Sequence, residues 1–174
     1  MRFLNHTVSH LNLMKTRALI VSFLASVVTM AFASSGDSKG PVSKADAAAQ
    51  AAHENYVTAI NSNNLEKLLG MLTEDVVYLA PNSPPMVGKP DVKPWLVEYL
   101  KAYKTHWDKP VLEFIVSGLW AFERYSYTST DTPVVGGDAV KDTGWGLVIY
   151  HLDADGKWRV ARDAWGSDRP VPTK

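Results

Sequence analysis

Two carboxylates in the C-terminal half of the sequence stand where they could move protons. Asp163 lies in RVARDAWGSD, with an apolar residue two positions away on either side, and Glu123 lies in AFERYSYT, where it alternates with Tyr125 and Tyr127. Strand residues two apart share a face. A carboxyl group desolvated among aromatic rings acquires a raised pKa, which suits a general acid or base. If both acids face inward, they form a candidate acid and base pair.

Each acid also has a structural interpretation, which we take as the default. Asp163 can accept hydrogen bonds from Tyr56, a tryptophan N–H or Arg162, and so hold the sheet to the first helix, because buried polar groups usually have partners. Glu123 can form an ion pair with an arginine on the outer surface of the sheet, and its inward orientation is left open.

Other chemistries find little support in the sequence. His53, His106 and His151 show no metal-ligand spacing, so we expect no metal site and no cofactor. No serine occupies a G-x-S-x-G elbow. The chain has no cysteine, which excludes thiol catalysis, disulfides and a lipoprotein anchor.

The N-terminus has the pattern of an export signal. Lys15 and Arg17 precede the apolar run ALIVSFLASVVTMAF, and a small-x-small pattern ends at Ala33. We therefore predict a signal peptide over residues 1–33, cleaved after Ala33, with translation starting at Met1 or Met14. A retained membrane anchor is the weaker alternative, because the run is shorter than the roughly 20 residues that span a bilayer.

The mature chain would consist of a flexible tether (residues 34–42), one domain (residues 43–170) and a short tail (residues 171–174). Without the signal it has 15 basic and 18 acidic residues, a formal charge of −3. A mildly acidic domain lacks the basic surface that nucleic acids and anionic lipids require. We expect a periplasmic or secreted protein that binds no nucleic acid and has no stable membrane anchor.

The order of the predicted elements indicates an α+β fold. Ser43 can cap a helix that reaches about Ile60 and presents Ala49, Ala52, Tyr56 and Ile60 on one face. Asn63 and Glu66 indicate a second helix, LEKLLGMLT. A strand, EDVVYLAP, leads into a proline-rich rim loop, and Pro90 starts a third helix that carries Trp95 and Tyr99.

Period-two alternation follows Pro110 and predicts strands over residues 111–117, 120–130, 143–152 and 157–167, with a hairpin turn at DADG. Helices followed by such a run indicate helices packed on a curved, mainly antiparallel sheet. The third of these strands is apolar on both faces. One face carries Trp145, Leu147 and Ile149, and the other carries the alternate residues from Gly144 to Tyr150. One face can therefore contact a partner subunit. In the last strand, composition does not choose between the Arg162 face and the Asp163 face.

The stretches NSNNLEKLLGMLTEDVVYLAPNSPPMVGKPDV, GLWAFERYSYT and DTGWGLVIYHLDADGKWRVARDAWGSD resemble the nuclear transport factor 2-like superfamily. Within it, they are similar to the SnoaL-like and ketosteroid-isomerase-homologue branch, of the domain of unknown function 4440 type. The resemblance covers about residues 45–170. It implies a cone-shaped α+β fold and homodimers, and it leaves the activity open because the superfamily contains enzymes and binding modules.

The resemblance argues against steroid isomerisation. In true ketosteroid isomerases a helix-1 tyrosine and a protonated aspartic acid donate hydrogen bonds to the steroid oxyanion, while a second carboxylate moves the proton. The tyrosine falls on Tyr56, but the proton-moving acid falls near Ala80 and the oxyanion acid near Trp145. Without a base at the substrate carbon, that route has no proton carrier.

The resemblance places Ala161, Asp163 and Trp165 inward, together with Trp145. The implied pocket surrounds Asp163 with aromatic side chains and suits a small apolar or cyclic molecule. Its candidate ligand-binding residues are Tyr78, Trp95, Tyr99, Glu123, Tyr127, Trp145 and Trp165. We expect a small-molecule-binding domain; the alternatives are a cofactor-independent lyase, isomerase or cyclase, with Asp163 as general acid/base and Tyr56 as orienting donor, or a periplasmic protein-interaction module.

Overall fold

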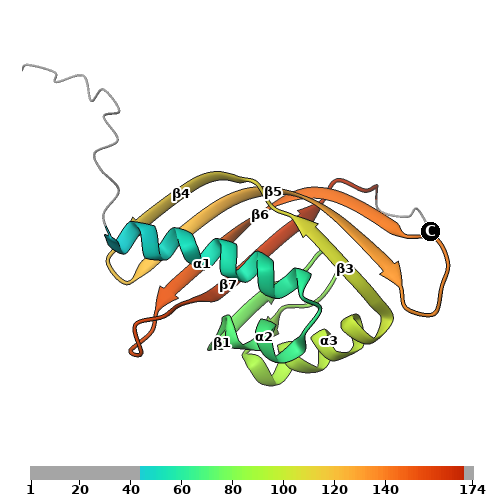
Figure 1. Ribbon diagram of the computed structural model, residues 1–174, viewed down its shortest axis with the longest axis horizontal. Helices are drawn as coiled ribbons and strands as arrows, with labels where there is room; N and C mark the ends of the chain where they lie inside the picture. The colour runs from blue at the N-terminus through green and yellow to red at the C-terminus, as the bar shows by residue number, and fades with distance from the viewer. Residues whose placement is uncertain (1–43, 171–174) are drawn as a thin grey trace, which may run out of the picture. The chain divides into compact units, whose positions relative to one another are not determined.

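The computed structural model describes residues 44–170, which form three helices and a seven-stranded sheet (Figure 1). The predicted signal peptide, the tether, the cap at Ser43 and the tail over residues 171–174 lie outside the described residues. Among the helices that are described, none is long and apolar enough to cross a membrane.

The helices are α1 (Lys44–Asn61), α2 (Leu65–Gly70) and α3 (Lys89–Ala102). On α1 the buried residues are Ala49, Ala52, Tyr56 and Ala59, spaced three or four apart. The small size of the three alanines lets α1 pack against β3 and β7. Tyr56 is the one large side chain among them, so it is the group that α1 projects toward the sheet.

The turn between α1 and α2 differs from the prediction. Asn64, rather than Asn63, caps α2, because its side-chain oxygen accepts the Lys67 N–H at 3.0 Å. Asn63 has φ 51°, a conformation that asparagine tolerates, and its side chain exchanges hydrogen bonds of 2.7 and 3.0 Å with the backbone of Thr105. The predicted helix over residues 65–73 ends at Gly70, since the following strand begins at Leu72.

The sheet has the strand order β2-β1-β7-β6-β5-β3, and β4 also pairs with β5. Only the β1–β7 pair is parallel in this described sheet, so the expectation of a mainly antiparallel sheet is confirmed. The DADG turn closes the β6–β7 hairpin, where the Gly156 N–H donates to the Asp153 carbonyl at 2.9 Å. The strands are β1 (Leu72–Leu79), β2 (Met86–Val87), β3 (Tyr103–Asp108), β4 (Val111–Ser117), β5 (Trp120–Pro133), β6 (Val140–Leu152) and β7 (Trp158–Ser167).

Strand β3 was not predicted. The period-two alternation begins before Pro110, since Thr105 is buried and Trp107 half-buried while Lys104, His106 and Asp108 are exposed. The polar composition of KTHWD concealed the strand. Its pairing with β5 places Trp107 and the residue that follows β3, Lys109, beside the inner face of the sheet.

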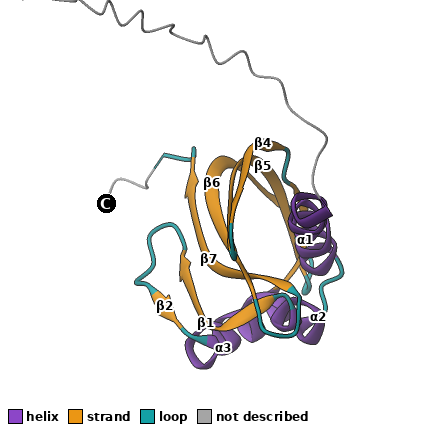
Figure 2. Ribbon diagram, turned by 90° about the vertical axis from the view of Figure 1, so that its left-hand side faces the viewer, coloured by secondary structure: helices purple, strands orange, loops and turns teal. Residues whose placement is uncertain are grey.

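The sheet curves around the helices, which cover its inner face (Figure 2). Gly144 and Gly146 of β6 are buried on that face, whereas Trp145 and Leu147 point outward. A Cβ on Gly146 would collide with the ring of Tyr125, and one on Gly144 with the ring of Tyr127. The two glycines therefore make room for tyrosines of β5, which fixes Trp145 on the outer face.

Strand β7 changes phase at a β-bulge. Tyr150 pairs with Val160 and Ile149 pairs with Arg162, so Ala161 has no partner in β6. Val160 is buried before the bulge and Asp163 after it. The sequence analysis considered two faces with strict alternation along the whole strand, and neither describes it fully. The extra residue at the bulge changes whether even-numbered or odd-numbered residues point inward.

Candidate functional site

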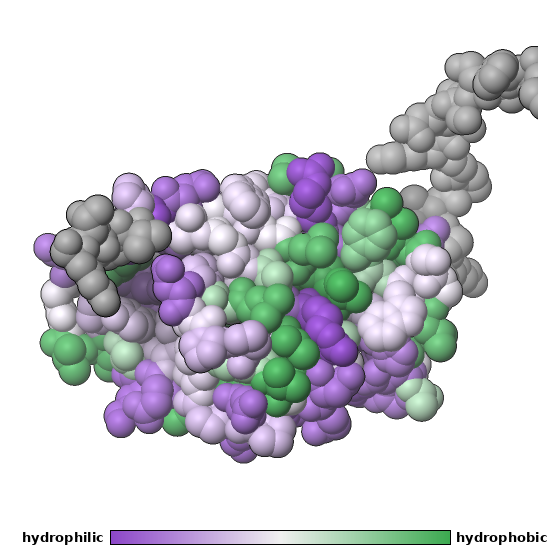
Figure 3. All heavy atoms as spheres, turned by 180° about the vertical axis from the view of Figure 1, so that it is seen from behind, coloured by the Kyte–Doolittle hydropathy of each residue, from purple (hydrophilic) through white to green (hydrophobic). Residues whose placement is uncertain are grey.

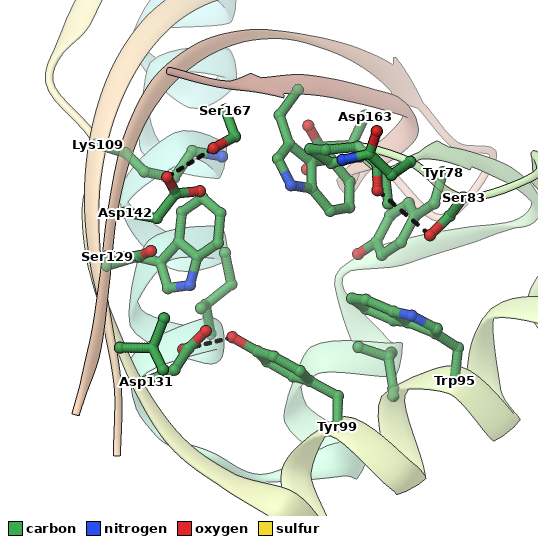
Figure 4. A pocket seen from close by; sticks show the side chains of 18 of the residues that line it. Tyr78, Ser83, Trp95, Tyr99, Lys109, Ser129, Asp131, Asp142, Asp163 and Ser167 are labelled. Carbon is green, nitrogen blue, oxygen red and sulfur yellow. Dashed lines mark hydrogen bonds between the residues drawn. The ribbon is translucent and has the colours of Figure 1, made fainter. Parts of the chain in front are cut away.

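A cavity of about 480 Å³ lies between the helices and the inner face of the sheet (Figure 4). Small-molecule sites commonly have this size and combine aromatic walls with a few polar groups. The rings in its lining belong to Tyr56, Tyr78, Trp95, Tyr99, Trp107, Tyr125 and Trp165. The polar side chains include Lys109, Ser129, Asp131, Asp142, Asp163, Ser167 and Arg169.

Trp165 lies at the centre of the aromatic wall. Its ring meets Tyr78 edge-on at 5.7 Å between centroids, Trp107 edge-on at 6.5 Å, and Trp95 at 6.3 Å. Trp95 in turn stacks on Tyr99 at 5.3 Å and 5°. The fold thus brings together four of the aromatic residues predicted for the pocket, namely Tyr78, Trp95, Tyr99 and Trp165. Their contact with a ligand stays a prediction.

Asp163 is the buried acid of the cavity, with 4% of its surface exposed. Its Oδ2 accepts a hydrogen bond from the Tyr56 hydroxyl at 2.8 Å, and its Oδ1 accepts one from the Tyr125 hydroxyl at 3.0 Å. The Tyr78 hydroxyl lies 2.8 Å from that of Tyr56. Because Tyr56 gives its proton to Asp163, Tyr78 donates to Tyr56. The bond from Tyr56 was expected, whereas Tyr125 takes the place considered for a tryptophan or Arg162.

The net effect of its surroundings is a raised pKa for the carboxyl group of Asp163. Burial raises the pKa of its carboxyl group; the positive charge of Lys109 and the hydrogen bonds from Tyr56 and Tyr125 oppose the rise, and the nearby Glu123 adds to it. Burial and the charge of Asp163 also hold the pKa of Tyr56 well above its usual value. Tyr56 is therefore a neutral donor, and Asp163 is a carboxyl group that holds its proton more tightly than a free aspartic acid does.

Lys109 is a functional-site residue that the sequence interpretation missed. It is 3% exposed and lines the cavity. Its Nζ lies 3.8 Å from the centroid of the Tyr125 ring and 4.8 Å from that of Tyr56. Burial lowers the pKa of Lys109, and the charges of Asp163 and Glu123 oppose that change. Lysine is seldom buried, so its residue type gave no indication of an inward orientation. The one available signal was its position two residues after Trp107 and four after Thr105, on the inward side of the alternation.

Glu123 faces inward, and the favoured interpretation of an outer-face ion pair was wrong. Its side chain is 0% exposed; Oε2 lies 3.0 Å from His53 Nδ1 and accepts the Tyr150 hydroxyl at 2.7 Å. On the outer face it is Arg124 that forms such a pair, with Glu113 at 3.4 Å. Glu123 does not line the cavity. It therefore influences the site through its charge on Asp163 and Lys109 rather than through contact with a ligand.

Trp145 does not belong to the pocket. It is 64% exposed on the outer face of β6 and is not part of the cavity lining. The family resemblance implied that Trp145 points inward, and this was wrong. Gly144 and Gly146 occupy the inward positions on either side of it, so Trp145 points outward. The sequence TGWGLV contained this signal, because glycines beside tyrosine-rich β5 mark positions without room for a side chain.

Tyr127 supports the lining from behind. It is buried and outside the cavity lining, its ring stacks on Trp107 at 4.6 Å, and its hydroxyl donates to Asp142 Oδ2 at 2.9 Å. The Ser167 hydroxyl donates to Asp142 Oδ1 at 2.7 Å (Figure 4). Asp131 accepts the Tyr99 hydroxyl at 2.6 Å. These two acids of the lining are therefore held by protein donors.

The position expected for a steroid-isomerase base is apolar, because Ala80 contributes its methyl group to the lining. Within residues 44–170, no group of three or more histidine, aspartate or glutamate side chains is arranged to hold a metal ion. Among the polar groups of the described lining, Asp163 and Lys109 are the most deeply buried charged residues.

Comparison with known proteins agrees with this fold. A family model described as "SnoaL-like domain" matches residues 53–161. A ketosteroid isomerase-like protein from Erwinia carotovora atroseptica is 25% identical, with a TM-score of 0.65 over 71% of this chain and 96% of that chain. A conserved protein from Planctomyces limnophilus is 22% identical, with a TM-score of 0.64 over 70% and 96%.

A nuclear transport factor 2-like superfamily protein from Salmonella enterica has a TM-score of 0.61 at 12% identity, covering 70% of this chain and 89% of that chain. No curated protein matches the chain. The expected superfamily and fold class are confirmed, and the likenesses below 25% identity concern the fold alone.

Proposed function

Because this chain belongs to the SnoaL-like domain family, we propose that it binds one small apolar or cyclic molecule in the cavity between the helices and the sheet. The observation that carries the proposal is the lining, in which rings from α3, β1, β3 and β7 surround a single deeply buried carboxyl group, Asp163. Flat rings of a ligand gain both buried area and ring contacts in such a wall. The ketosteroid isomerase-like relative has the same fold.

Two tryptophan variants test this proposal. Trp165→Ala removes the ring at the centre of the wall, whereas Trp120→Ala removes an exposed ring that contacts His151 outside the cavity. We expect native mass spectrometry to show a retained small molecule, or calorimetry to show binding of tetralin, in the wild type and in Trp120→Ala. Both signals should be lost in Trp165→Ala. Equal binding in the two variants would place the ligand elsewhere.

A second candidate function is cofactor-independent lyase, isomerase or cyclase chemistry at Asp163. It is favoured by the carboxyl group itself, which lines the cavity, has a raised pKa and is held in place by Tyr56 and Tyr125. Tyr56 then acts as a positioning residue, because its proton is engaged by Asp163. The enzyme hypothesis requires that Asp163→Asn abolishes turnover of a bound substrate while its affinity is kept. Unaltered turnover in that variant would refute it.

The proposed location is the periplasm or the medium. The support is the basic and apolar N-terminal pattern with its small-x-small site at Ala33. N-terminal sequencing of protein recovered from the periplasm should begin at Ser34, and Ala31→Glu should leave a longer precursor in the cells. An unprocessed N-terminus at Met1 or Met14 in the mature fraction would contradict export by this signal.

We also propose a homodimer formed through the outer face of the sheet. Hydrophobic residues gather on this face (Figure 3), and the outer patch is defined here as Ile115, Phe122, Trp145 and Leu147. The patch is flanked by the Arg124–Glu113 pair, so it presents both signs of charge. In a two-fold symmetric dimer, Arg124 of one copy can lie opposite Glu113 of the other, so two copies of this surface are complementary in charge.

A further inference from the structure

Lys109 is a buried residue of the cavity lining, and its ammonium group has no hydrogen-bond acceptor among the described residues. Its close contacts are the ring faces of Tyr125 and Tyr56, at 3.8 and 4.8 Å from Nζ. Aromatic faces attract a cation but accept no conventional hydrogen bond. An ammonium group carries three donors, and buried donors nearly always find acceptors. The cavity that Lys109 lines is therefore where an acceptor is missing.

The two carboxyl groups whose charges act on Lys109 make their hydrogen bonds with other residues. The same two tyrosines that pack on Lys109 give their hydroxyl protons to Asp163, at 2.8 and 3.0 Å. Glu123 uses Oε2 for His53 and Tyr150, and its Oε1 has no hydrogen-bond partner among the described residues, Lys109 included. Lys109 thus interacts with both carboxyl groups through charge and lacks a direct bond to either. The arrangement leaves a preorganised cation facing a space of about 480 Å³.

The charge around Lys109 indicates which kind of acceptor fits. Two carboxyl groups, Asp163 and Glu123, lie close enough to stabilise its positive charge. A ligand carboxylate would bring a third acid to one cation, and like charges at a buried site are costly. A neutral carbonyl oxygen adds no charge and accepts a hydrogen bond from the ammonium, which is stronger than a bond between neutral groups.

We propose that Lys109 binds the carbonyl oxygen of a cyclic or aromatic ketone or aldehyde whose ring lies against the wall formed by Trp95, Trp107 and Trp165. This inference rests on the proposed binding function of the cavity and adds the chemical class of its ligand. The ammonium group orients the carbonyl and polarises it, with Asp163 in the same cavity lining. Lys109 is in this sense the specificity residue of the pocket.

Two bicyclic probes of similar shape separate the ring contacts from the carbonyl contact. α-Tetralone carries one carbonyl group on the ring, and tetralin has none. Calorimetry gives the affinity ratio of tetralone to tetralin in the wild type and in Lys109→Met, which keeps a long apolar side chain. The ratio should fall about tenfold in Lys109→Met, since a hydrogen bond to a charged group is lost. Lys109→Arg, which keeps the cation, should recover part of it.

An infrared measurement needs no variant that must fold. The carbonyl stretch of bound, isotope-labelled tetralone should lie at lower wavenumber in the wild-type protein than in hexane. A stretch at the hexane position, or equal affinity ratios in the wild type and Lys109→Met, would overturn the role of Lys109 while leaving the binding function intact. Tighter binding of 1-naphthoate than of tetralone would show an anion site instead. Failure of the wild type to bind either bicyclic probe would count against the binding function itself, and with it this inference.

Discussion

The hydroxyl group of Tyr56 on α1 donates a 2.8 Å hydrogen bond to Asp163 on β7, 107 positions away in the sequence. The bond joins the helix to the parallel strand pair at the centre of the site, because Asp163 lies opposite Tyr78 of β1. Both residues are buried, and both line the cavity. The same contact therefore joins two elements of the fold and forms part of the proposed binding site.

Tyr56→Phe keeps the ring and removes this donor. We expect the free energy of unfolding to fall by about 1 to 3 kcal/mol, because a buried carboxyl group loses one of its two hydrogen bonds. Urea denaturation followed by circular dichroism measures the change. Tyr103→Phe is the matched control, since the Tyr103 hydroxyl has no hydrogen bond to the described residues. Similar losses in the two variants would show that the Tyr56 bond contributes little.

Asp163→Asn tests the direction of the pKa shift. The folded state raises the pKa of Asp163 above its ordinary value of 3.8, mainly through burial. The folded protein then holds this proton longer than the unfolded chain does, so the stabilising contribution is complete below that ordinary value and is lost as pH rises through the folded pKa. The difference in unfolding free energy between the wild type and Asp163→Asn should decrease as the pH rises above about 4. An increase over that range would mean that the pKa is lowered.

Gly146→Ala should damage the site from the far side of Tyr125. The added Cβ would lie within 2.6 Å of the Ala164 carbonyl oxygen and collide with the Tyr125 ring. Overpacking of this kind costs about 2 to 3 kcal/mol, and displacement of Tyr125 should also weaken tetralin binding. Gly70→Ala is the control, because nothing lies within 4 Å of its added Cβ. Thermal unfolding of both variants gives the comparison, and a fully stable Gly146→Ala would contradict the packing described.

Trp145→Glu should dissociate the proposed dimer without unfolding the domain. The substitution places a charge at the most exposed residue of the outer patch, which we expect to weaken association at least about tenfold. Sedimentation velocity measures the oligomeric state, and Val135→Glu, at a 97% exposed position in the β5–β6 loop, controls for added charge. A wild-type monomer would refute the dimer. A specific periplasmic partner on the same patch would favour the protein-interaction module.

Much of the fold could be predicted because its signals are local. The alternation after Pro110, the DADG turn and the helix signals each depend on a few neighbouring residues, and the main strands and three helices follow them. Strand β3 was missed because its outward residues are strongly polar. The position of Asp163 was open because a β-bulge depends on pairing with β6, which no pattern within β7 encodes.

The candidate site was predicted less completely, for a physical reason. Asp163, Tyr56 and the four aromatic residues of the wall are types that suit a pocket, so their chemistry drew attention to them. Lys109 is of a type that usually extends into water, and its burial is made possible by two tyrosine rings and two acids from distant elements. The orientation of Trp145 depended on the space needed by Tyr125 and Tyr127.

The unpaired residue Ala161 divides β7 into two segments that can be altered separately. Upstream of it, Trp158 and Val160 pack into the core; downstream, Asp163 and Trp165 line the cavity. With regular pairing and no extra residue accommodated, the guanidinium of Arg162 would point inward in place of the carboxyl group. Regular pairing of the full sequence would thus replace an acid with a base at this point of the cavity wall. Deletion of Ala161 would instead keep Arg162 opposite Ile149 and Asp163 opposite Val148, so the unpaired residue sets the side chain that faces the cavity.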